Sequence, residues 1–146
     1  MKSQPNFVRD QSGMMLIESL LAILIFSLGI LALVGLQATS IKQSTDAKYR
    51  SEAALLANEV IGQMWVSDRT TAVLQANFNS PGGAEYSNWR DNRVRAALPG
   101  VAANSPTAPT IAIDANGIAT VTVLWNAPNE PAGAPIHQYV AIAQIR

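Results

Sequence analysis

The chain has 146 residues, with ten basic and ten acidic side chains, one histidine, no cysteine and a formal net charge of zero. A balanced charge gives no electrostatic reason to expect a nucleic-acid partner, and this length accommodates one ordinary domain at most. Without cysteine, no disulfide braces the fold. The chain has a single histidine, His137, and no cysteine, so we do not expect a transition-metal site of the usual kind.

The first predicted element is a membrane-spanning helix. Residues 20–36 carry no charged side chain, and Ser27 is their only polar side chain. A helix over residues 14–36 would be about 35 Å long, enough to cross a hydrocarbon layer of about 30 Å. Two bases and one acid precede this segment, so the N-terminus is expected in the cytoplasm and the rest of the chain outside.

One carboxylate, Glu18, lies near the start of this span. An ionised carboxylate at the centre of a bilayer costs about 2.5–3.5 kcal/mol, so such a residue is read as functional, with a cationic partner at the same depth. A new N-terminal amine would serve. Cleavage after Gly13 would make Met14 the first residue, and in a staggered bundle of parallel helices its amine would meet Glu18 of a neighbouring subunit.

These residues resemble the leader of type IV prepilins and pseudopilins. The shared pattern is a short basic leader ending in Gly, a hydrophobic run, and Glu at the fifth mature position, here Gly13 followed by Met14-Met15-Leu16-Ile17-Glu18. The family usually has Phe where this chain has Met14. The resemblance implies that an inner-membrane prepilin peptidase cleaves after Gly13 and methylates the amine of Met14, and that Glu18 aligns the subunit in assembly.

Within this superfamily, the chain is most similar to PilV-type minor pilins, also called type IV pilus modification proteins. The similarity lies in the end of the apolar run, Leu28-Gly29 through Gly35-Leu36-Gln37, and in the segments NWRDNRVRAALPG and TVTVLW. Major pilins usually have a proline midway along the apolar run, and here the first proline after the leader is Pro81. That difference and the lack of cysteine favour a minor subunit.

The helix is expected to continue over residues 37–67, which contain no proline and one glycine. Apolar residues recur at helical spacing and would pack on a domain; they are Ile41, Tyr49, Ala53, Leu56, Val60 and Met64, with Ile61 and Trp65 beside them. Met64 and Trp65 are predicted to be core residues rather than a binding patch.

Residues 68–100 are predicted to form a loop and a short amphipathic helix that ends at Pro99-Gly100. Trp89, Arg93, Ala96 and Ala97 are three and four apart, with Val94 and Leu98 on an adjoining stripe, and the arginines are expected on a solvated helix face rather than in a docking patch.

Residues 109–146 are predicted to form the sheet. Residues 110–125 alternate around a turn at Ala115-Asn116-Gly117, and residues 136–145 would be a third strand. The predicted fold is α+β and type IV pilin-like, a long N-terminal helix packed on a small antiparallel sheet of about three or four strands. Its parts would be a leader (1–13), a transmembrane and assembly helix (14–36) and a periplasmic globular domain (37–146).

The resemblance predicts a minor pilin, a low-copy filament subunit that primes or modifies pilus assembly. It would be a single-pass inner-membrane protein with its C-terminus in the periplasm until it enters the filament. Its partners would be other major and minor pilins, the prepilin peptidase and the membrane. We expect no enzymatic activity, cofactor, metal, nucleic acid or small-molecule substrate.

Two alternatives remain at this point. A pseudopilin of a type II secretion system would share the leader, the helix and the sheet. An exported soluble binding protein could be released by signal peptidase after Ser40, because Ala38-Thr39-Ser40 is a small-x-small triplet. Against the second alternative, the apolar run exceeds the roughly 7–15 residues usual in a signal peptide, and Glu18 would have no role.

Overall fold

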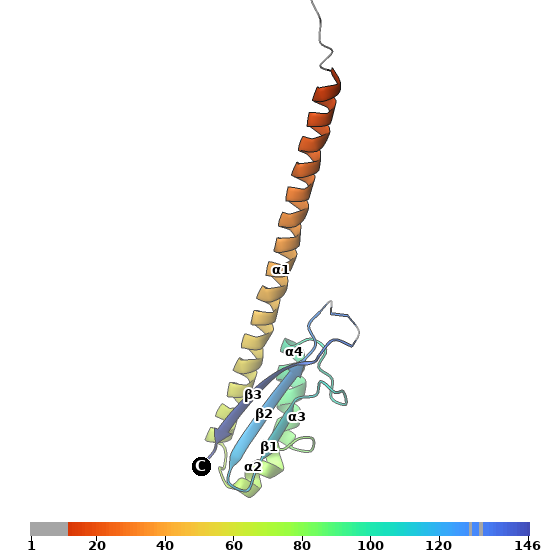
Figure 1. The fold of residues 1–146 in the computed structure, drawn as a ribbon. Helices are drawn as coiled ribbons and strands as arrows, with labels where there is room; N and C mark the ends of the chain where they lie inside the picture. The colour runs from red at the N-terminus through yellow and green to blue at the C-terminus, as the bar shows by residue number, and fades with distance from the viewer. Residues whose placement is uncertain (1–11, 129, 132) are drawn as a thin grey trace, which may run out of the picture. The chain divides into compact units, whose positions relative to one another are not determined.

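The computed structural model describes residues 12–128, 130–131 and 133–146, so most of the predicted leader lies outside the described residues. The elements, in chain order, are helix α1 (Ser12–Val66), α2 (Thr71–Phe78), α3 (Ala84–Trp89), a π-helical turn (Arg90–Val94), α4 (Arg95–Ala97), and strands β1 (Thr110–Ile113), β2 (Ile118–Trp125) and β3 (His137–Gln144) (Figure 1). The predicted α+β, pilin-like fold is confirmed: a long N-terminal helix packs on a small antiparallel sheet of three strands.

The chain divides into two compact units, one ending at Gln43 and the other comprising Ser44–Arg146. Helix α1 contributes to both. In the second unit it supplies one wall of the core, because Ala53, Leu56, Ala57, Val60 and Met64 are buried there. Four of these five residues belong to the stripe predicted from the sequence.

Two members of the predicted stripe are not core residues. Trp65 is 45% exposed and Ile41 is 67% exposed, so the prediction that Trp65 is buried was wrong. An α-helix turns by about 100° per residue, and the neighbouring Met64 faces the core. Trp65 is therefore carried round to the edge of the buried stripe.

The amphipathic segment before Pro99 is helical, and its buried face combines residues of both predicted stripes. Trp89, Val94 and Leu98 are buried, whereas Arg93 and Ala96 are exposed. The reason is the π-helical turn, in which hydrogen bonds join residues five apart. This turn brings Val94, five residues after Trp89, onto the same face, and the arginine leaves the stripe.

The sheet has the order β1-β2-β3, and both pairs are antiparallel. Ile111 lies opposite Val121, and Val121 lies opposite Ala141. The core-facing residues of β1 and β2 alternate with exposed or half-buried ones, as the sequence pattern predicted; they are Ile111, Ile113, Ala119, Val121, Val123 and Trp125. The predicted turn is confirmed, with Asp114 Oδ1 accepting the N–H groups of Asn116 and Ile118 at 2.8 Å each.

Two buried aromatic side chains connect the helices to the rest of the globular unit. Trp89 Nε1 donates a hydrogen bond to the carbonyl oxygen of Leu56 in α1 at 3.1 Å. The hydroxyl of Tyr86 donates to the carbonyl oxygen of Pro109, which precedes β1, at 2.7 Å. Because both donors are buried, leaving either unpaired would cost about 1–3 kcal/mol. The position of α3 against α1 and the sheet is therefore specified by polar contacts as well as by packing.

The hairpin turn generates a prediction about Gly117. Its φ is +73°, and a Cβ built there would lie 2.7 Å from the carbonyl oxygen of Ile145, whereas a Cβ on Gly133, at φ +89°, would have nothing within 4 Å. Both alanine substitutions cost about 1–2 kcal/mol of left-handed strain, but only Gly117→Ala also displaces a neighbouring backbone. We expect Gly117→Ala to lower the free energy of unfolding more than Gly133→Ala, measured by urea unfolding of the full chain in detergent micelles. Equal losses would contradict this account.

A second prediction concerns acid stability. Asp91 accepts hydrogen bonds from Arg90 at 2.8 and 2.9 Å and from Arg95 at 3.3 Å, and Arg90 is the main cause that lowers the pKa of Asp91 from 3.8 to about 2. A carboxylate with a lower pKa in the folded chain stabilises the fold above its ordinary pKa, and that contribution is lost as the pH falls. The stability difference between the natural chain and Asp91→Asn should therefore shrink as the pH is lowered from 3.8 towards 2. A difference that does not change with pH in urea titrations would refute the prediction.

Candidate functional site

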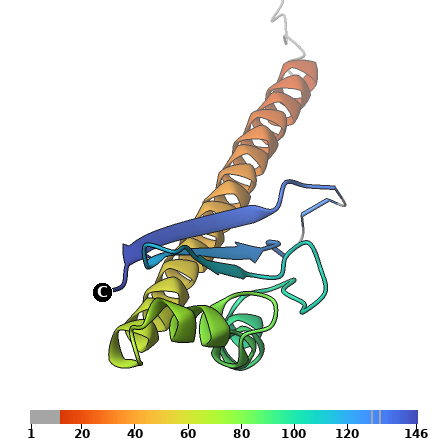
Figure 2. The same ribbon diagram turned by 90° about the horizontal axis from the view of Figure 1, so that it is seen from below.

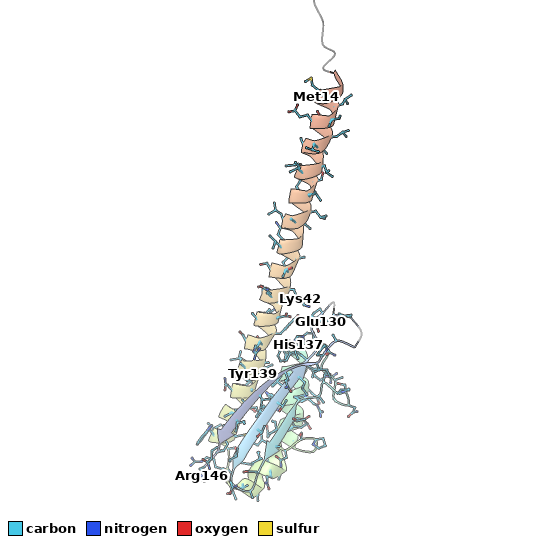
Figure 3. All side chains as sticks on the ribbon, in the orientation of Figure 1. Met14, Lys42, Glu130, His137, Tyr139 and Arg146 are labelled. Atoms are coloured by element: carbon cyan, nitrogen blue, oxygen red, sulfur yellow. The ribbon has the colours of Figure 1, made fainter. Side chains whose placement is uncertain are left out.

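The N-terminal part of α1 is apolar all the way round. Every described side chain from Gly13 to Gln43 is exposed, and the exposed large hydrophobic residues include Met14, Leu20, Phe26, Leu31 and Leu36 (Figure 3). A helix without a polar face needs apolar surroundings on every side. Among the described residues, α1 is the one helix long and apolar enough to cross a membrane, and no residue of its most apolar window is buried by the rest of the chain.

Three hydroxyl groups in this part of the helix are satisfied within it. Ser19 Oγ donates to the carbonyl oxygen of Met15 at 2.8 Å, and Ser27 Oγ donates to that of Ile23 at 2.7 Å. Thr39 Oγ1 donates to Gly35 in the same way at 3.1 Å. A polar group that finds its partner on its own helix carries little cost in hydrocarbon. These three hydroxyl side chains therefore fit a lipid-facing helix.

Glu18 is different, because the helix does not satisfy it. It is the only charged side chain in residues 12–41. It is exposed, and no hydrogen bond or ion pair joins it to another residue of the part that the structure describes. A carboxylate has no proton to donate to a carbonyl of the preceding turn. Any partner of Glu18 therefore lies outside the part of the chain that the structure describes.

The structure places the predicted processing residues beside this carboxylate. Gly13 and Met14 lie in the first turn of α1, one turn before Glu18, and Figure 3 labels Met14 at this end of the helix. Residues four apart share a helix face, and four residues rise by about 6 Å. The Cα–Cβ bond of a helical residue tilts towards the N-terminus, so the Glu18 side chain extends towards the end at which a new amine on Met14 would lie.

The single histidine, His137, contacts two other side chains of the globular unit. The His137 ring stacks on the Trp125 ring with centroids 5.5 Å apart, and His137 Nε2 lies 3.1 Å from both carboxylate oxygens of Glu130. In the described residues, no three His, Asp or Glu side chains are grouped so that they could hold a metal ion. These contacts fit a structural role for His137 at the start of β3.

The exposed apolar residues of β3 were not predicted from the sequence. Val140 and Ile142 are 45% and 69% exposed, on the opposite face from the half-buried Tyr139 and Ala141. The sequence pattern could have indicated them, because this strand has apolar residues on both faces. In a two-layer fold only one face of a strand packs on the core, so the other apolar face is left exposed.

Comparisons of the chain with protein-family models, with curated proteins and with solved structures gave no match. The interpretation of its function therefore depends on the leader pattern, the apolar helix and the position of Glu18.

Proposed function

We propose that this chain is a minor pilin of a type IV pilus, a low-copy subunit that helps to prime or modify filament assembly. Helix α1 would hold it in the inner membrane, with the globular unit in the periplasm. The observation that carries the proposal is Glu18, the single charge of an otherwise apolar helical segment, five residues after Gly13 and without a partner in the described residues.

The proposed mechanism begins with cleavage. Prepilin peptidase hydrolyses the Gly13–Met14 bond on the cytoplasmic side, and the Met14 amine is methylated and remains cationic. Glu18 and the amine of a neighbouring subunit then leave water together, because a paired charge costs far less in hydrocarbon than two separate ones. Because each residue of a rigid helix has a fixed position along the helix axis, this one charge pair sets the axial offset between adjacent subunits.

The continuity of α1 supports an uncleaved anchor over release after Ser40. The helix runs unbroken from Ser12 to Val66, through Ala38-Thr39-Ser40 and into the residues that form the core. The same helix that carries the apolar segment is thus part of the globular core.

The proposal predicts the N-terminus of the mature protein. Mass spectrometry of protein purified from membranes should find Met14 as the first residue, bearing one methyl group. Gly13→Leu should retain the leader, because the peptidase recognises glycine there, whereas the neighbouring Ser12→Ala should be processed normally. A mature protein that begins at residue 1 or 2 would exclude prepilin processing. One that begins at Ile41 would establish the soluble alternative.

The proposal also predicts the effect of neutralising Glu18. Glu18→Gln keeps the size of the side chain and should leave membrane insertion intact, because it removes a charge from the apolar segment. Removing one partner of a buried charge pair costs about 2–5 kcal/mol, so co-purification with partner pilins and recovery in sheared filaments should fall by about tenfold or more.

Ser19→Ala is the matched control, because it also removes a polar group from the next position but breaks only a bond within the helix. It should assemble normally. Normal recovery of Glu18→Gln in filaments would remove the basis of the proposal, and incorporation into a secretion pseudopilus instead of a pilus would favour the pseudopilin alternative.

A further inference from the structure

The two edges of the sheet differ in whether their outward backbone groups have hydrogen-bond partners. The outer edge of β1 is covered by the segment after α2: Ser80 N–H donates to the carbonyl oxygen of Ile111 at 2.9 Å, and Asn79 Oδ1 accepts the N–H of Ile113 at 2.8 Å. Gln75 Nε2 donates to the carbonyl oxygen of Ile113 at 2.8 Å. The outward backbone groups of this short strand therefore have partners within the chain.

The outer edge of β3 has no such cover in the described part of the globular unit. Ile145 N–H donates to the carbonyl oxygen of Gly117 at 2.8 Å, which fixes the phase of the β2–β3 ladder. Because pairing alternates along an antiparallel strand, residues 139, 141 and 143 bond to β2, and the backbone groups of residues 138, 140, 142 and 144 point away from it. No strand lies beyond β3 among the described residues, and β3 forms the sheet margin away from α2 and α3 (Figure 2).

This open edge carries none of the features that usually protect one. Natural edge strands are kept unpaired by lysines, prolines, bulges or short length. Strand β3 spans eight residues and contains no Lys, Arg, Asp, Glu, Pro or Gly. The side chains on its solvent-facing side include Val140 and Ile142, which are 45% and 69% exposed. An eight-residue, uncharged edge with apolar side chains is a template for another strand.

We propose that the free edge of β3 binds an extended segment of another protein chain, which becomes a fourth strand of the sheet. Backbone hydrogen bonds to residues 138, 140, 142 and 144 would hold it. The side chains that β2 and β3 themselves present on the solvent-facing side beside this edge are uncharged; they are Thr120, Thr122, Leu124, Gln138, Val140, Ile142 and Gln144. A charge lies at the end of this face, where Arg146 donates to the side-chain amide of Gln144. The partner segment is therefore uncharged, with alternate apolar residues over Val140 and Ile142, since burying a charge there would be costly.

A second copy of this chain does not fit the edge. Two β3 strands pair antiparallel through a two-fold axis perpendicular to the sheet, and this axis reverses every direction in the sheet plane. Residues 44–66 of α1 lie against the sheet, so the two copies would present residue 44 at opposite ends, which is incompatible with the proposed anchoring in one membrane. Head-to-tail pairing is also blocked, because Asn79 and Ser80 cover the β1 edge.

The direct test is residue-resolved amide hydrogen exchange on the full chain in detergent micelles. The probe is a blocked peptide in which four Thr-Val repeats lie between two solubilising lysines. Saturating peptide should slow exchange at residues 138, 140, 142 and 144 by about tenfold or more, whereas residues 139, 141 and 143 are already protected by β2. A peptide with glutamate in place of each valine should have no effect. Unchanged exchange at the four outward amides with the Thr-Val peptide would overturn the proposal.

Two variants at one position make the test specific to the backbone. Val140→Pro removes an outward N–H that the sheet does not use, and proline is tolerated on the open side of an edge strand. Val140→Thr keeps this N–H while it lowers the apolar area. Val140→Pro should abolish protection by the peptide, and Val140→Thr should retain most of it.

Folding and self-association are checked in the same samples. Continued slow exchange at residues 139, 141 and 143 shows that β3 still pairs with β2, and Ile142→Pro serves as the second variant if Val140→Pro unfolds. Peptide protection that survives in a folded proline variant would refute strand addition. Protection of the outward amides without peptide, rising with protein concentration together with a dimer in sedimentation, would make a second copy the occupant and overturn the proposed partner.

Discussion

The carboxylate of Glu18 imposes the constraint on which the N-terminal helix depends. The hydroxyls of Ser19, Ser27 and Thr39 donate to carbonyl groups one turn earlier and are satisfied by the helix that carries them. A carboxylate can only accept hydrogen bonds, and every N–H of a helix interior is already used. Within residues 14–36, the helix therefore satisfies the two serines but not Glu18, and this segment contains no positively charged side chain. In the proposed function, association with a neighbouring subunit would supply the missing positive charge.

The same helix also makes the globular unit possible. A three-stranded sheet is stable only when one of its faces is covered, and a domain of about a hundred residues without disulfides has little core to spare. Residues 53–64 of α1 provide that cover through small and medium-sized side chains, and Trp89 is bonded to the helix backbone at Leu56. The apolar segment and one wall of the core therefore belong to one continuous element, and a change that disturbs the C-terminal half of α1 acts on the sheet directly.

The sequence was sufficient wherever a regular period operated. The 3.6-residue period predicted α1 as far as Met64, and the two-residue period with its Asn-Gly turn predicted β1, β2 and β3. It was insufficient where geometry departs from the period: the π-helical turn places Val94 on the buried face with Trp89, and Trp65, predicted to be a core residue, is exposed. The spacing from Gly13 to Glu18 can be recognised in the sequence alone. The covered edge at Asn79 and the open edge at β3, in contrast, depend on which segments meet in the folded chain. Strand order could not be read from a pattern within each strand.

The position of β3 at the end of the chain has a consequence for the order of events during synthesis. The core joins residues near position 55 to residues near position 140, and Ile145 is buried beside the hairpin turn. The ribosome delivers the helix first and the closing strand about eighty residues later, so the helix must wait for its sheet until the intervening chain has been made. During that interval the apolar stripe of α1 is uncovered. The growing chain therefore exposes this stripe to chaperones and proteases until its last strand is complete, and a chain truncated before β3 would leave the stripe uncovered permanently.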